Sequence, residues 1–125
     1  MALKLSARQQ AQLAYLQSLP PRFSRIKHTV ELMASLKADE ATVRGLGRQL
    51  DEIRANCQAL SLGGLAETCG LMSTISRRGG GLQMKVRGLR ELMVSMHVNY
   101  DGALRAASTP EAAENGEPPP GPTPG

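Results

Sequence analysis

Aromatic residues are the scarcest group in this 125-residue sequence, at 2% of the chain, with one Phe, two Tyr and no Trp. Hydrophobic residues still make up 41%, so a core must be built mainly from Leu, Met, Val, Ile and Ala. Helix bundles pack well with such side chains, whereas sheets favour β-branched and aromatic residues. No stretch alternates apolar and polar residues for long enough to predict a strand. The composition therefore predicts an all-α fold.

Long apolar runs and metal-binding motifs are also missing. No run of 18 apolar residues is present, and the first residues include charges and glutamines where a signal peptide would be apolar. We therefore expect a cytoplasmic protein with no membrane partner. The two cysteines, Cys57 and Cys69, lie on apolar helix stripes with no matching histidine pair. This pattern predicts two buried free thiols and neither a metal nor another cofactor.

Charge of one sign dominates the part of the chain that should fold. The net charge is +4, but all 15 Lys and Arg precede Thr109 together with eight of the 11 acidic residues, which leaves +7 on that part. The basic residues are scattered over several expected helices, with no aromatic platform and no DNA-binding motif. By charge alone, an acidic protein surface suits a basic body as well as nucleic acid does. The missing motif and aromatic platform make nucleic-acid binding the weaker alternative.

Apolar residues at steps of three and four predict five helices, at about residues 7–17, 21–38, 40–60, 62–76 and 82–106. Ser6 and Gln9 form a capping-box pattern before the first helix, and Asp39 is placed to cap the third. We expect the second helix to bury its apolar residues as far as Leu36, and Met84 to widen the apolar stripe of the last helix.

These helices predict three regions. Residues 1–18 form an N-terminal helical extension, residues 19–107 an antiparallel up-down four-helix bundle, and residues 108–125 a disordered tail rich in Pro, Gly and Glu. Short connections and matching stripes favour packing within one chain, and therefore a monomer. The long stripe of the last helix, which includes Leu89 and Met93, could instead form a coiled-coil dimer. Docking of the first helix on the bundle is left open.

One flank of the third helix is unusual. Five residues share this face at i, i+3 and i+4 spacing: Gly47, Asp51, Arg54, Ala55 and Gln58. The small residues one turn before and after Asp51 leave its carboxylate above a shallow floor that a partner could approach closely. The alternative interpretation is a solvated charge that pairs weakly with Arg48 or Arg54.

The sequence around Asp51 resembles a known motif. Leu50-Asp51-Glu52-Ile53-Arg54-Ala55 is similar to Leu-His-x-Leu-Lys-Gly of histidine phosphotransfer (HPt) domains, with Asp51 in the place of the phosphorylated histidine. The similarity continues without a gap through residues 60–67. Upstream, Leu19-Pro20-Pro21-Arg22-Phe23 resembles the Leu-Pro-x-Arg-Leu opening of some HPt domains. Residues 19–104 thus resemble an HPt domain that lost its phosphoacceptor, with Arg54 and Ala55 as further departures from the motif.

The resemblance implies a function without catalysis. It implies a pseudo-HPt signalling module that binds a receiver domain or another two-component phosphorelay protein as adaptor or inhibitor, with no phosphoryl transfer. The implied partner-binding residues lie on the third helix: Gly47, Arg48, Asp51, Glu52, Arg54, Ala55 and Gln58. The alternative function is a scaffolding bundle that dimerises or binds a partner helix through its long last helix.

Catalytic constellations are not apparent, so we expect no enzyme and no catalytic residue. Asp51 and Glu52 are adjacent and point about 100° apart on a helix, so they cannot share a proton. His28 lies off the apolar stripe and is followed by no Lys-Gly pair, which indicates a surface histidine. His97 has no acidic or thiol partner at ligand spacing, which indicates a structural or solvated side chain.

Overall fold

Five helices and no strand make up residues 4–111, the part of the chain that the computed structural model describes. The helices are α1 (Ala7–Gln17), α2 (Pro20–Ala34), α3 (Glu40–Ala59), α4 (Gly63–Arg77) and α5 (Leu82–Ser108). The predicted all-α fold is confirmed. Within residues 4–111, no helix is both long enough and apolar enough to span a membrane.

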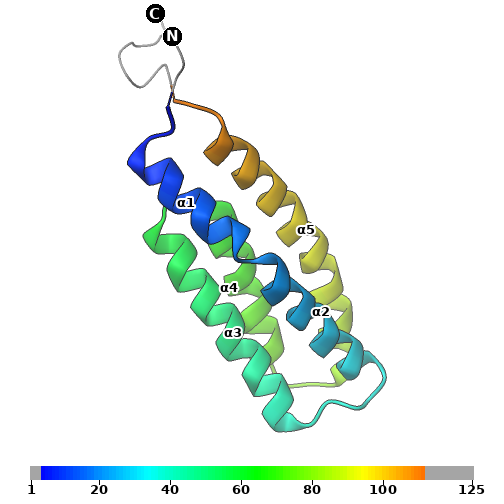
Figure 1. Ribbon diagram of the computed structural model, residues 1–125. Helices are drawn as coiled ribbons and strands as arrows, with labels where there is room; N and C mark the ends of the chain where they lie inside the picture. The colour runs from blue at the N-terminus through cyan, green and yellow to red at the C-terminus, as the bar shows by residue number, and fades with distance from the viewer. Residues whose placement is uncertain (1–3, 112–125) are drawn as a thin grey trace, which may run out of the picture.

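The helices lie alongside one another as a bundle of rods. Figure 1 shows α1 and α2 following each other along one side, while α3, α4 and α5 run in alternating directions. The contacts of α3 with α4 are the most extensive, and α4 also packs on α5. The 27 residues of α5 make it about 40 Å long. This length lets α5 contact both α1 and α2.

The break between α1 and α2 follows from two prolines. Pro20 and Pro21 occupy the first turn of α2, where a missing N–H group costs no hydrogen bond. Pro20 cannot donate to the carbonyl of Leu16 and so cannot continue α1. That carbonyl instead accepts from the N–H of Leu19 at 3.1 Å and from the hydroxyl of Tyr100 at 3.0 Å.

Two buried glutamines dock α1 on the rest of the protein. Gln9 donates its amide to the carbonyl oxygens of Ala106, at 3.1 Å, and Thr109. Gln12 donates to the carbonyl oxygen of Leu60 at 2.8 Å. These bonds satisfy main-chain acceptors near the ends of α5 and α3, where a helix has no partners of its own. The predicted capping box of Ser6 and Gln9 is also present.

The helix α2 ends four residues earlier than its apolar pattern predicts. Leu36 adopts a left-handed conformation with φ 59°, and Lys37 donates from its N–H to the carbonyl of Leu32 at 2.8 Å. This is a Schellman turn, which usually places glycine where Leu36 stands. The side chain of Leu36 is 68% exposed, so the expectation that it is buried was wrong. Asp39 then caps α3 as predicted, because its carboxylate accepts from the N–H of Thr42 at 2.8 Å.

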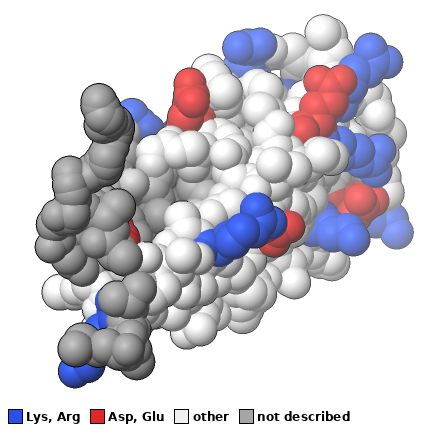
Figure 2. All heavy atoms as spheres, turned by 90° about the horizontal axis from the view of Figure 1, so that it is seen from above, with Lys and Arg blue, Asp and Glu red and all other residues white. Residues whose placement is uncertain are grey.

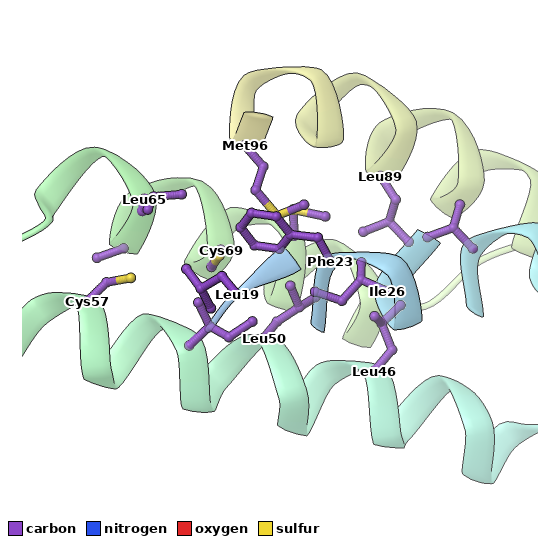
Figure 3. Close-up of a cluster of buried hydrophobic side chains, with 14 of the residues drawn as sticks. Leu19, Phe23, Ile26, Leu46, Leu50, Cys57, Leu65, Cys69, Leu89 and Met96 are labelled. Atoms are coloured by element: carbon purple, nitrogen blue, oxygen red, sulfur yellow. The ribbon is translucent and has the colours of Figure 1, made fainter. Parts of the chain in front are cut away.

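The core is almost wholly aliphatic, as the composition predicts. Figure 3 shows α5 facing α2 and α3, with Met96 pointing towards Phe23 and Leu89 towards Ile26. Cys57 and Cys69 are buried and free, which confirms the prediction for both thiols. Burial raises the pKa of Cys57 to about 11 and that of Cys69 to about 12, because a thiolate is poorly solvated there. Met84 lies outside this core, 79% exposed, so its predicted role in the stripe was wrong.

The last described residues, 108–111, belong to the predicted tail. The last helix continues to Ser108, and Glu111 forms an ion pair with Arg8. The rest of the predicted disordered tail, residues 112–125, lies outside the described residues.

Candidate functional site

The face of α3 that carries Asp51 borders α4. An open groove of about 1070 Å³ follows this boundary. From α3 it is lined by Asp51, Arg54 and Gln58, and α4 supplies the opposite wall. The two helices approach closely because glycine replaces a side chain in each of them, at Gly47 in α3 and at Gly70 in α4.

Asp51 is held by two side chains of α4. The hydroxyl of Ser73 donates to one carboxylate oxygen at 2.6 Å, and Arg77 pairs with the other oxygen at 2.6 Å. Arg77 also donates to the hydroxyl oxygen of Ser73 at 2.6 Å, which closes the triangle. The hydrogen bond from Ser73, followed by the guanidinium of Arg77, lowers the pKa of Asp51. The carboxylate therefore stays ionised at neutral pH and joins α3 to α4.

The shallow floor predicted beside Asp51 is occupied. Gly47 is buried, and a Cβ atom built on it would lie 3.2 Å from the guanidinium carbon of Arg77 and 3.2 Å from the hydroxyl of Ser76. The glycine therefore leaves room for the half-exposed side chain of Arg77 to lie against α3. The open floor was a wrong expectation at Gly47, because Arg77 reaches back over α3 to its partner Asp51. Ala55, one turn after Asp51, is exposed as expected.

The predicted partner-binding residues do not all come together. Asp51, Arg54 and Gln58 line the groove, whereas Gly47 is covered. Glu52 points towards α2, where it lies 3.6 Å from Arg22. Arg48 and Ala55 are exposed, but neither belongs to the groove lining. Asp51 forms its ion pair with Arg77 rather than with Arg48 or Arg54. After the hydrogen bond from Ser73, the positive charge of Arg54 nevertheless contributes to the lowered pKa of Asp51, which is the weak pairing of the alternative interpretation.

The residues of α4 that complete the groove were not predicted as part of the site. They are Gly63, Ala66, Glu67, Gly70, Leu71, Ser73, Thr74 and Arg77, followed by Arg78 at the helix end. The sequence does contain a signal, because Gly70, Ser73 and Arg77 recur at steps of three and four. That spacing would have placed a small residue, a hydroxyl and a cation on one helix face.

Two arginines of the groove have no ion-pair partner among residues 4–111. Arg54 lies across the backbone of α4, so that a Cβ atom at Gly70 would be 3.1 Å from its Cδ and Nε atoms. Arg78 follows the last turn of α4 in an extended conformation. The other ion pairs formed by exposed arginines lie elsewhere, as in the 3.2 Å pair of Arg90 with Glu31. The groove therefore presents two guanidinium groups that have no ion pair among residues 4–111, beside that of Arg77, which is paired with Asp51.

The remaining candidate groups form no second site. His28 is exposed, and His97 contacts Phe23 edge-on with ring centroids 5.6 Å apart. Among residues 4–111, no group of three or more His, Cys, Asp and Glu side chains is placed to hold a metal ion. Figure 2 shows acidic and basic side chains interspersed on one face of the molecule. A continuous basic surface, which nucleic-acid binding would favour, is not present on that face.

Comparisons with protein-family models, with curated proteins and with solved structures gave no match to this chain.

Proposed function

We propose that this protein is a non-catalytic, HPt-like signalling module that binds a receiver-like phosphorelay protein through the groove between α3 and α4. It acts as adaptor or inhibitor and transfers no phosphoryl group. The single observation that carries the proposal is the state of Asp51. At the position that the resemblance assigns to the transferable histidine stands a carboxylate that Ser73 and Arg77 hold at 2.6 Å each. Such a group ties two helices together and offers no imidazole nitrogen for phosphorylation.

The helix arrangement supports the same proposal. We infer an antiparallel four-helix bundle of the HPt type, in which α3 and α4 form the hairpin that displays the site. The order of contacts, α2 with α3, α3 with α4 and α4 with α5, suits that up-down topology. The α1 helix extends the line of α2 (Figure 1) and adds its own contact with α5.

A receiver-like partner suits the charge of the groove. The resemblance of residues 19–104 to HPt domains implies a receiver domain as the partner. Receiver domains carry an acidic pocket at their active site. Arg54 and Arg78 suit that role, because both are exposed, both line the groove and neither has an ion pair with any described residue. Electrostatic complementarity of this kind speeds association and selects partners.

The test is a pull-down from the native cell with three proteins: wild type, Arg54→Glu and Arg87→Glu. Arg87 is an exposed arginine of α5 outside the groove, so its variant is a control with the same charge change. We expect wild type and Arg87→Glu to recover a receiver-containing protein that Arg54→Glu loses. Recovery of the same proteins by all three variants, or of no receiver-containing protein by wild type, would contradict the proposal.

A second measurement tests the absence of transfer. A receiver domain carrying radiolabelled phosphate is mixed with the wild-type chain, and the label on each protein is followed with time. We expect no label on the chain, because Asp51 is engaged by α4 and no histidine stands in its place. Label on the wild-type chain that disappears in Asp51→Asn would show transfer and refute the non-catalytic function.

The scaffolding alternative retains one supporting observation. Three apolar side chains on the outer side of α5 are exposed: Met84 by 79%, Val94 by 66% and Val98 by 65%. The coiled-coil contact expected at Leu89 and Met93 does not suit this alternative, because Leu89 is fully buried in the core of a single chain. A dimer would use Val94 and Val98 instead. Sedimentation of wild type and Val94→Asp/Val98→Asp tests it, and a monomer at all concentrations for both proteins would remove it.

A further inference from the structure

The two arginines of the groove that have no ion pair among the described residues are separated along α4. Arg54 crosses α4 at Gly70, and Arg78 follows the last residue of the helix. Gly70 and Arg78 are eight residues apart, so the levels at which the two arginines meet α4 differ by about 12 Å along the helix axis. Arg77 lies beside Arg78 in sequence, but its guanidinium is engaged by Asp51 and Ser73. The groove thus offers two positive charges that have no ion pair among the described residues, a neutralised pair between them, and the carboxylate of Glu67 on the same lining.

The separation restricts the class of ligand. A single phosphate or carboxylate bound by Arg54 at the level of Gly70 leaves the level of Arg78, about 12 Å further along the helix axis, to a second anionic group. A nucleic-acid strand would bring a closely spaced row of phosphates against Glu67, which also lines the groove. It would also find no aromatic side chain for base stacking among the lining residues. An acidic protein segment with separated carboxylates matches both the charges and their spacing.

We propose that the α3–α4 groove binds an acidic segment of its partner, in which two carboxylate side chains about 12 Å apart pair with Arg54 and Arg78. This inference rests on the proposed function for the identity of the partner, and adds the chemistry that it must present. In a helical partner the two carboxylates stand at positions i and i+7, which share a face and lie about 10.5 Å apart along the axis. Asp51 takes no part in the contact, because both of its oxygens are engaged within the protein.

Gly70 is the residue that makes this arrangement possible. Its missing side chain lets Arg54 lie flat across α4, with the Cδ and Nε atoms 3.1 Å from where a Cβ would stand. A side chain at position 70 would displace the Arg54 side chain from its position across α4. The position of Arg54 relative to Arg78 thus depends on the close approach of the Arg54 side chain to the backbone at residue 70. Only glycine allows this approach without displacing Arg54.

The experiment uses two fluorescent helical peptides of identical composition. One carries Glu at i and i+7, and the other carries them at i and i+3. Their binding to the full chain is followed by fluorescence anisotropy at low salt, where ion pairs are least screened. The proteins are wild type, Arg54→Gln, Arg78→Gln and the control Arg87→Gln. All three substituted arginines are exposed, and circular dichroism checks that each variant is as helical as wild type.

We expect wild type and Arg87→Gln to prefer the i, i+7 peptide. We expect Arg54→Gln and Arg78→Gln each to weaken its binding about two- to fivefold, as the loss of one exposed ion pair implies, and to remove the preference for spacing. Equal affinity of wild type for the two peptides would overturn the proposal. A preference that survives in either groove variant, or an equal loss in Arg87→Gln, would overturn it as well.

These outcomes are separate from those of the proposed function, because no receiver domain is used. If receivers bind the chain and the peptides show no spacing preference, the acidic-segment proposal fails and the signalling function stands. If the preference is found and no receiver binds, the groove chemistry stands and the partner assigned under the proposed function is wrong.

Discussion

Asp51 of α3 and Arg77 of α4 form a 2.6 Å ion pair that also includes the hydroxyl of Ser73. The pair joins two helices at the position where the resemblance to HPt domains implies a phosphorylated histidine. It makes Asp51 a structural connection between α3 and α4, and the function proposed above assigns partner recognition to the arginines beside it.

The first prediction concerns the strength of this connection. We expect Asp51→Asn to lower the free energy of unfolding at pH 7 by about 1 kcal/mol, since Asp51 is half exposed and solvent screens the pair. Urea denaturation measures the change. The control is Glu52→Gln, because the ion pair of Glu52 with Arg22 is longer, at 3.6 Å. A larger loss from the control would contradict the role of Asp51.

The same pair predicts a pH dependence. The pKa of Asp51 is lowered in the folded protein, so its stabilisation is present above the unfolded value of about 3.9 and is lost as the pH falls through the folded value. We expect the stability difference between wild type and Asp51→Asn to shrink below about pH 4. Urea midpoints of both proteins between pH 7 and pH 2 measure it, and a difference that stays constant would refute the mechanism.

Docking of α1 depends on Gln9. The side chain of Gln9 is only 1% exposed, and its amide satisfies carbonyl groups at the end of α5. Gln9→Ala should reduce stability by about 1–3 kcal/mol, because two hydrogen bonds from a buried side chain are lost. Hydrogen exchange should also become faster in α1. Gln10→Ala is the matched control, since Gln10 is exposed and bonds only within its own segment. Equal effects of the two substitutions would exclude this docking role.

The turn after α2 carries removable strain. Leu36 is exposed and has φ 59°, a conformation that costs an L-residue about 1–2 kcal/mol. We expect Leu36→Gly to stabilise the protein by up to about 1 kcal/mol, after part of the gain is offset by the greater freedom of glycine in the unfolded chain. Thermal unfolding measures the shift. Lys37→Gly, at the next position, should give no gain, and a gain there equal to that at Leu36 would argue against strain.

Two glycines of α5 should respond differently to alanine. A Cβ at Gly102 would meet no atom within 4 Å, whereas a Cβ at Gly88 would lie 3.1 Å from the Cδ1 atom of Ile75. Gly102→Ala should therefore stabilise the protein by about 1 kcal/mol through helix propensity. Gly88→Ala should raise the stability by less, or lower it, because Ile75 of α4 must move to make room for the new Cβ. Urea denaturation compares the two, and the reverse order would contradict the packing of α4 on α5.

The helices and most of the core were predictable because their causes are local. Apolar residues at steps of three and four identified the buried faces, and Ser6 and Asp39 were recognised as caps from their own side chains. The end of α2 was missed because Leu36 occupies a turn position that normally signals itself with glycine. Met84 was misplaced because periodicity does not tell how wide a buried stripe is.

By itself, the sequence determined the helical class, the aliphatic core with its two buried thiols, and the candidate position of Asp51. Only the tertiary structure decided what Asp51 does, because Ser73 lies 22 residues later in the chain and Arg77 four residues beyond it. It also decided that Gly47 is covered and that Gln9 bonds to the carbonyl of Thr109, 100 residues away. Spacing along one helix specifies which side chains share a face. It does not specify which face of another helix will meet them, since that depends on how all five helices pack together.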